Sequence, residues 1–177
     1  SLIRLKRPIR KFIAYFQAYT NTYAPVHVLR ELFTEAIRCP DVVALSVATR
    51  PDCLPDVTVK LLAELNRIKP VWVELGLQTI HEETARYIRR GYPLSCFTDA
   101  VKRLHEASVA QIIVHTILGL PGETDRHVFE TMNFLNAQPV TGIKLQLLHV
   151  LSGTDLARDY AEGRFDTLTR EHYIQLV

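Results

Sequence analysis

The strongest constraint on the fold is a regular alternation of five β-rich runs with segments of helical periodicity. The runs are rich in Val, Ile, Leu and aromatic residues, each ends in polar or turn residues, and they occupy residues 11–18, 42–50, 71–78, 111–119 and 142–150. Their starting points lie 29 to 40 residues apart, about the length of a strand–helix–strand crossover. This alternation predicts a parallel sheet with helices outside it.

The segments between the runs carry the signals of helix starts. Apolar residues recur there every three or four positions, as in amphipathic helices. Pro25, Pro55 and Pro93 stand where a first-turn proline is tolerated, and Thr124 is typical of a helix N-cap. The long interval before the fourth run leaves room for an extra short helix at residues 81–90.

The two faces of the predicted strands differ in polarity, which decides between an open sheet and a barrel. In the run 71–78, Val and Leu alternate with Trp72, Glu74, Gly76 and Gln78. A strand covered by helices on both faces is expected to be apolar on both, whereas a polar row suits a ligand-filled interior. A complete eight-unit barrel takes about 250 residues, more than the 177 present. We therefore expect an α/β fold, an incomplete (βα) TIM-like barrel of five parallel strands with outer helices, as a single domain over residues 1–177.

The composition excludes several classes of protein. The chain is 47% hydrophobic and 23% charged with a net charge of +2, which argues against a disordered chain and against a general polyanion binder. No apolar run reaches the ~18 residues of a membrane span, so we expect no membrane association. Three scattered cysteines make no disulfide framework, so we expect a cytoplasmic location. Cys39, Cys53 and Cys96 show no CxxC spacing, so the sequence predicts no metal ligands in this chain.

Polar residues at the carboxyl ends of the runs are the candidates for a site, because ligands bind at that end of parallel strands. Glu74 is the most unusual of them, since it lies among Val, Leu and Trp and a buried carboxylate is costly unless it is paired. It is either half of an internal ion pair, for instance with Arg50, or a carboxylate that receives the paired hydroxyls of a ribose. Gln78 lies on the same face, nearer the carboxyl end.

The fourth and fifth runs end in further candidates with simpler alternatives. The turn at residues 119–124 (GLPGET) combines glycines, which let a backbone approach a ligand, with a helix N-terminus, but such turns are also common without a ligand. His115 shares a face with Ile117 and is either a satisfied core residue or a ligand. His149 ranks lower, because alternation places it toward the helices.

Three segments taken in order resemble a known family. Residues 46–52 (SVATRPD), 74–79 (ELGLQT) and 119–124 (GLPGET) recur in this order in radical S-adenosylmethionine (SAM) enzymes. The resemblance covers nearly the whole chain. It is greatest to the YhcC-like group, followed by the elongator catalytic subunit and oxygen-independent coproporphyrinogen oxidase.

The resemblance implies a core that is an incomplete (βα)6 barrel, with the five runs as its second to sixth strands. The family's CxxxCxxC signature, which holds a 4Fe-4S cluster after the first strand, does not occur in this sequence. We therefore expect a chain truncated at both ends and inactive by itself. The family's Gly-Gly-Glu segment is replaced by residues 17–21 (QAYTN), so contacts to the methionyl amino group would come from backbone carbonyls or from Tyr19 and Asn21.

The resemblance also implies where SAM would bind. Glu74 and Gln78 suit the ribose hydroxyls, and Arg50 with Ser46 or Thr49 suits the methionyl carboxylate. Apolar side chains and the open backbone of a glycine suit the adenine. The complete expected cofactor-binding set is Gln17, Tyr19, Asn21, Ser46, Thr49, Arg50, Glu74, Gln78, His115, Ile117, Gly119, Gln146 and Leu148.

The activity implied by the resemblance is reductive cleavage of SAM to a 5′-deoxyadenosyl radical that abstracts hydrogen, an iron–sulfur chemistry of oxidoreductase or transferase type. An electron donor such as flavodoxin or ferredoxin is implied, and the substrate is a small molecule or a tRNA. Two alternatives stay open. One is a (βα) barrel lyase or aldolase with Glu74 or His115 as base. The other is a non-catalytic RNA-binding module built around Arg86, Arg89 and Arg90.

Overall fold

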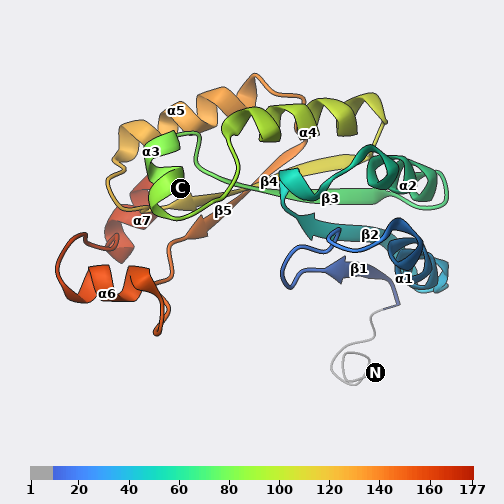
Figure 1. The fold of residues 1–177 in the computed structure, drawn as a ribbon, viewed down its shortest axis with the longest axis horizontal. Helices are drawn as coiled ribbons and strands as arrows, with labels where there is room; N and C mark the ends of the chain where they lie inside the picture. The colour runs from blue at the N-terminus through green and yellow to red at the C-terminus, as the bar shows by residue number, and fades with distance from the viewer. Residues whose placement is uncertain (1–9) are drawn as a thin grey trace.

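A computed structural model describes residues 10–177 of the chain. Its centre is a five-stranded sheet in which every neighbouring pair is parallel and the order follows the sequence (Figure 1). The expectation of five parallel strands in sequential order is confirmed, and each strand lies within the run that predicted it. The strands are β1 (Phe12–Phe16), β2 (Val42–Thr49), β3 (Val71–Gln78), β4 (Gln111–Leu118) and β5 (Gly142–Leu147).

Helices follow each of the five strands. The N-caps of three of them are the predicted residues Pro25, Pro55 and Pro93, and Thr124 caps the next. The backbone N–H of Thr124 donates to His127 Nδ1 at 3.0 Å, which satisfies one donor at that helix start. The helices are α1 (Val26–Arg38), η1 (Pro51–Cys53), α2 (Asp56–Asn66), α3 (Glu82–Tyr87), α4 (Leu94–Glu106), α5 (Asp125–Asn136), α6 (Asp155–Ala161) and α7 (Arg170–Leu176).

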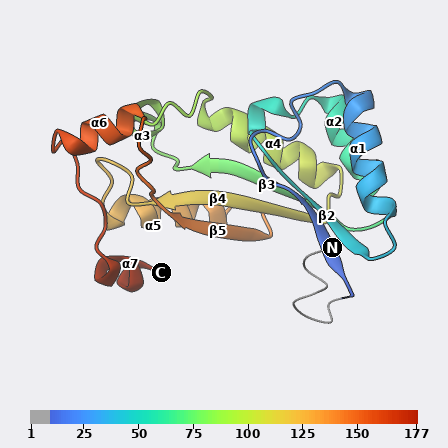
Figure 2. The same cartoon turned by 90° about the horizontal axis from the view of Figure 1, so that it is seen from below.

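The helices α1, α2, α4 and α5 lie along one side of the sheet, and the hydrophobic core is packed between them and the strands (Figures 1 and 2). On that side β3 presents Val71, Val73, Leu75 and Leu77, all with no exposed surface. Burying such side chains contributes about 1.5–3 kcal/mol each. The apolar face of the strands therefore packs against the outer helices of a half-barrel, and the polar face lines its inside.

The opposite, concave face of the sheet is open. Along β4, Ile112, Val114 and Leu118 are buried under the helices, whereas His115 and Ile117 are only half-buried on the other face. This alternation follows from the pleat of the strand, because successive side chains point to opposite faces. The polar side chains of the strands are therefore gathered inside the half-barrel.

The helices α6 and α7 differ from the others, since neither buries a residue. Figures 1 and 2 show both of them beyond the carboxyl ends of the strands and not against the sheet. Polar contacts hold α6, namely Arg89 Nη2 to Asp155 Oδ2 at 2.5 Å and Tyr87 Oη to Asp159 Oδ2 at 2.6 Å. Over residues 10–177, no helix has the length and apolar character needed to cross a membrane.

Candidate functional site

A cavity of about 250 Å³ lies on the concave face toward the carboxyl ends of the strands. Each of the five strands, or the loop directly after it, contributes at least one lining residue. The expected residues Gln17, Tyr19, Thr49, Arg50, Glu74, Gln78, His115 and Gln146 are brought together here. The remaining lining residues are Tyr15, Ala48, Gly76 and Lys144.

Glu74 is the centre of a hydrogen-bond network to which every strand contributes one side chain. Its Oε1 accepts from Ser46 Oγ of β2 at 2.6 Å. Its Oε2 accepts from Tyr15 Oη of β1 at 2.9 Å, from His115 Nε2 of β4 at 2.6 Å and from Lys144 Nζ of β5 at 3.3 Å. With Glu74 only 7% exposed, these donors replace the water that the carboxylate lost on folding.

The network keeps Glu74 ionised. Burial raises the pKa of this carboxyl, but the hydrogen bonds from Ser46, His115 and Tyr15 and the charge of Lys144 outweigh burial and lower it to about 2. A carboxylate of this pKa is a poor proton acceptor at neutral pH. The network therefore argues against Glu74 as the base of a lyase or aldolase and favours a role as a hydrogen-bond acceptor.

His115 is neutral at neutral pH, because burial lowers its pKa and outweighs the opposing hydrogen bond to Glu74. Since an ionised Glu74 can only accept, the proton of the neutral ring must sit on Nε2. Nδ1 is then left as an acceptor on the ring.

The proposed ion pair between Glu74 and Arg50 is wrong. Arg50 instead forms a bidentate pair with Asp52, with Nε to Oδ1 at 2.9 Å and Nη2 to Oδ2 at 2.6 Å. The cation beside Glu74 is Lys144. Arg50 lies two residues from Asp52 in the loop after β2, so the local pair forms without reaching into the barrel, while its guanidinium still lines the cavity.

Tyr15 and Lys144 were missed by the sequence analysis. Alternation would have found both, because Tyr15 shares a face with Gln17 and Lys144 shares a face with Gln146. These two residues stand deeper in the barrel than the strand ends, where ligand-binding residues were expected.

Gln78 reaches the cavity through an irregularity in β3. The β3–β4 register shifts between Gly76 and Gln78, and Gln78 has a φ of 66°. This left-handed backbone is uncommon for a residue other than Gly, and such residues cluster at ligand sites. The hydroxyl of Tyr92 supports the irregularity by donating to the Gly76 carbonyl and, at 3.3 Å, to Gln78 Oε1.

Of the three arginines in the RNA-binding alternative, Arg90 is buried, while Arg86 and Arg89 are not. Arg90 is 6% exposed, and its guanidinium donates to the carbonyl oxygens of Thr79 at 2.6 Å and Tyr92 at 2.9 Å and pairs with Glu82 at 3.0 Å. Arg90 stabilises the loop after β3, because it donates to buried carbonyl oxygens that cannot accept from water. Arg90 is therefore unavailable to the phosphates of an RNA.

Five expected residues do not line the cavity. Ser46 stands behind the Glu74 carboxylate. Asn21 is used locally, since its Nδ2 donates to the Ala48 carbonyl at 3.0 Å. Gly119 lies against the C-terminal segment, where Leu168 covers it. The other two expected residues outside the cavity are Ile117 and Leu148.

Within residues 10–177, no group of three or more His, Cys, Asp or Glu side chains is arranged to hold a metal ion. Cys39 is exposed, whereas Cys53 and Cys96 are half-buried. Burial raises the pKa of both half-buried thiols, which disfavours the thiolate that a cluster needs. The described cysteines therefore do not fit an iron–sulfur cluster.

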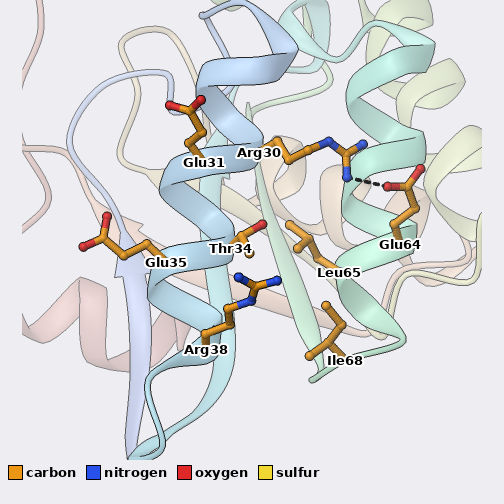
Figure 3. Close-up of a pocket in the computed structure, with 8 residues that line it drawn as sticks. All are labelled: Arg30, Glu31, Thr34, Glu35, Arg38, Glu64, Leu65 and Ile68. Atoms are coloured by element: carbon orange, nitrogen blue, oxygen red, sulfur yellow. Dashed lines mark hydrogen bonds and ion pairs between the residues drawn. The ribbon is translucent and has the colours of Figure 1, made fainter.

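A larger groove of about 720 Å³ lies on the outer surface between α1 and α2 (Figure 3). Its lining carries both signs of charge, including an exposed pair between Arg30 Nη1 and Glu64 Oε2 at 2.7 Å. Exposed pairs of this kind contribute little free energy. The groove is on the helical side of the sheet, so it is separate from the cavity in the half-barrel.

The architecture is that of an incomplete (βα) barrel with a cavity inside it, at the carboxyl ends of its strands, where barrels of this kind place their sites. A profile described as the Radical SAM superfamily matches residues 2–135, and the chain belongs to that superfamily. The resemblance inferred from the three segments is thereby confirmed.

Two curated relatives support this assignment. YtqA of Bacillus subtilis is 47% identical over 167 residues, which are 94% of this chain and 52% of that protein. YhcC of Escherichia coli K12 is 38% identical over 165 residues, which are 93% of this chain and 53% of that protein. The chain thus spans about half the length of these relatives.

A solved structure shows the same fold. The Elp3 protein of Methanocaldococcus infernus with an N-terminal deletion superposes with a TM-score of 0.82 over 99% of this chain and 46% of its own. At 20% identity this likeness concerns the fold alone.

Proposed function

We propose that this chain is the SAM-binding barrel of a radical SAM enzyme and that the cavity on its concave face holds the cofactor. The observation that carries the proposal is Glu74, an ionised carboxylate in the wall of that cavity. A carboxylate is costly to bury and needs several partners, and groups with strongly shifted pKa values cluster at functional sites. Membership of the superfamily supports SAM as the ligand.

The described residues fit the nucleoside half of SAM on chemical grounds. Glu74 Oε1 has one protein donor, Ser46, and so retains capacity to accept a ribose hydroxyl. Gln78 Nε2 has no partner among residues 10–177 and can donate to the other oxygen of the diol. The expected adenine contacts Ile117, Leu148 and Gly119 lie outside this cavity, and Leu168 covers Gly119, so these three residues are not part of the proposal.

The methionyl half would be held at the other side of the cavity. Arg50 is 45% exposed in its side chain and can bind the carboxylate while Asp52 fixes its orientation. Thr49 stands beside it, with its hydroxyl 2.6 Å from that of Thr22. Gln17, Tyr19 and Gln146 would complete the mouth of the site.

Together with a 4Fe-4S cluster and an electron, SAM supplies a 5′-deoxyadenosyl radical that abstracts hydrogen. In this proposal the cluster is held by residues outside the described chain, and flavodoxin or ferredoxin delivers the electron. The residues of this chain bind and orient the cofactor and exclude water from it. The substrate class is a small molecule or a tRNA.

Calorimetric measurement of SAM affinity in the full-length, cluster-bearing protein tests the ribose role. Glu74→Ala should weaken binding by about 1–3 kcal/mol, the cost of losing a charged hydrogen-bond partner. Glu83→Ala, which removes an exposed carboxylate of α3, is the matched control and should leave affinity unchanged. Circular dichroism must show both variants folded, and unchanged affinity in folded Glu74→Ala would remove Glu74 from the ribose role.

A second measurement tests the reaction class. The full-length protein, reconstituted anaerobically with iron and sulfide and reduced with dithionite, should convert SAM into 5′-deoxyadenosine. A reconstituted protein that carries a 4Fe-4S spectrum and binds SAM, but forms no deoxyadenosine, would contradict the proposed reaction.

A further inference from the structure

Lys144 is the least firmly held partner of Glu74. The Oε2 atom of Glu74 accepts from three donors, although a carboxylate oxygen has about two lone pairs. The contact from Lys144 Nζ, at 3.3 Å, is the longest of them and the one at the edge strand β5. Its side chain is 41% exposed into the cavity, whereas that of His115 is 15% exposed.

Lys144 also has a position that does not depend on Glu74. Its ammonium donates to Tyr15 Oη at 3.0 Å and lies 5.2 Å from the centre of the same ring. A flexible four-carbon stem lets the ammonium move by an ångström or two while that second contact is kept. Displacement from Glu74 therefore need not expel Lys144 from the barrel.

We propose that Lys144 is an exchangeable partner of Glu74. While one ribose hydroxyl binds Oε1, the other takes the place of Lys144 at Oε2, and the released ammonium then binds an oxyanion group, carboxylate or phosphate, of the molecule that reacts in the cavity. This inference rests on the proposed function, and it adds a substrate class and an order of binding, with cofactor first and anionic substrate second.

The charges in the cavity favour this order. Among the described residues, Glu74 is the carboxylate that lies within 4.0 Å of Lys144 Nζ. When a hydroxyl takes its place, the half-buried ammonium loses its direct contact with a carboxylate, and a second anion restores such a contact. In the proposed function Arg50 is occupied at the other side by the methionyl carboxylate, so Lys144 is, among the described residues that line the cavity, the cation left for a substrate to engage.

Lysine labelling in the full-length protein tests the exchange without measuring activity. With an amine-acylating reagent and mass spectrometry, saturating adenosine should raise the labelling rate of Lys144 about threefold, because an ion-paired ammonium is shielded and a free one is not. Burial opposes it, but the hydrogen bonds and charges of Tyr15 and Glu74 raise the pKa of Lys144, so release also makes the amine more reactive. Lys102, exposed on α4, is the internal control and should not change.

Two further ligands test the exchange with the ribose hydroxyl and the binding of the anion separately. 2′,3′-Dideoxyadenosine lacks the hydroxyls and should leave Lys144 protected. Inorganic phosphate added to the adenosine complex should restore protection, whereas phosphate alone should have no effect. If Lys144 is protected from labelling in the presence of SAM alone but not of adenosine alone, the anion that Lys144 binds is the carboxylate of SAM. That result would overturn the proposed substrate class.

Calorimetry on the same samples separates failure of this inference from failure of the proposed function. If adenosine binds but Lys144 labelling does not change, the exchange is overturned while the ribose role of Glu74 stands. If adenosine does not bind, the ribose role fails and the exchange fails with it. In folded Glu74→Gln, Lys144 should be labelled rapidly with or without adenosine, and slow labelling would contradict the pairing itself.

Discussion

Lys144 Nζ of β5 donates a 3.0 Å hydrogen bond to Tyr15 Oη of β1, although these strands are the two edges of the sheet. Side chains from the opposite edges of a flat five-stranded sheet could not meet, because neighbouring strands lie about 4.8 Å apart. The contact therefore shows that the sheet curves enough to bring its two edge strands within reach of each other's side chains. Both residues line the cavity, and Glu74 accepts a hydrogen bond from each of them.

Acid stability should depend on Glu74. Its pKa is lowered from 4.5 to about 2 in the folded chain, so its ionised form stabilises the protein above pH 4.5. That contribution, about 3 kcal/mol by linkage, is lost as the pH falls from 4.5 toward 2. Urea titrations across this range should show a smaller loss of stability in Glu74→Gln than in the wild type. Glu35→Gln, on the exposed face of α1, should behave like the wild type; equal slopes in all three proteins would contradict the low pKa.

Removing the Ser46 hydroxyl should destabilise the fold. Ser46 is 2% exposed and is the one described donor to Glu74 Oε1, at 2.6 Å. Ser46→Ala leaves part of a buried charge without a partner, and we expect a loss of about 2 kcal/mol in the free energy of unfolding. Ser95→Ala on the exposed side of α4 serves as the control. A loss as small as that of the control would mean that water reaches Glu74 in place of the hydroxyl.

Alanine substitutions at two glycines of the turn after β4 distinguish the cost of backbone strain from that of a steric clash with the C-terminal segment. Gly119 and Gly122 have φ values of 81° and 80°, so Ala should cost about 1 kcal/mol at either. A Cβ at Gly119 would lie 2.9 Å from Leu168 Cγ, whereas one at Gly122 would meet nothing within 4 Å. Only Gly119→Ala should therefore loosen the segment that ends in α7, seen as faster tryptic cleavage after Arg170. Equal cleavage in the two variants would show that Leu168 does not anchor this segment.

The buried arginine after β3 should be essential for stability. Arg90→Met removes the donors that fill the carbonyls of Thr79 and Tyr92 and leaves Glu82 without its partner. We expect a loss of about 3 kcal/mol in unfolding free energy, typical of breaking a buried charged group's contacts. The exposed Arg86→Met is the comparison and should lose little. Should both variants unfold at the same urea concentration, Arg90 would have to be a surface residue in solution.

The 177-residue chain alone should not assemble a 4Fe-4S cluster. Three thiolates must converge on a cluster, and Cys39, Cys53 and Cys96 do not form such a group in the described part of the chain. Anaerobic incubation with iron and sulfide, followed by absorbance spectroscopy and iron analysis, checks this. A stoichiometric 4Fe-4S spectrum would show that these cysteines can come together.

Much of the site could be predicted because strand periodicity is a local property. Alternation along each strand predicted that Glu74 and His115 point to the polar face of their strands, and the rule that ligands bind at carboxyl ends selected that region of the chain. The prediction failed where a residue had a choice of partners. Arg50 pairs with Asp52, two residues away in the same loop. Lys144, from the middle of β5, reaches Glu74 instead.

The order of strands and helices, the apolar face of each strand and the helix starts were determined by the sequence itself, because they depend on residues within a few positions of one another. The tertiary structure decided what depends on curvature. Tyr15 and Lys144 are separated by 129 positions and meet only because the sheet bends around them. The sheet as a whole brings four donors to Glu74, and they set its pKa. No periodicity along the chain encodes these distances, since they are fixed by the packing of all five strands at once.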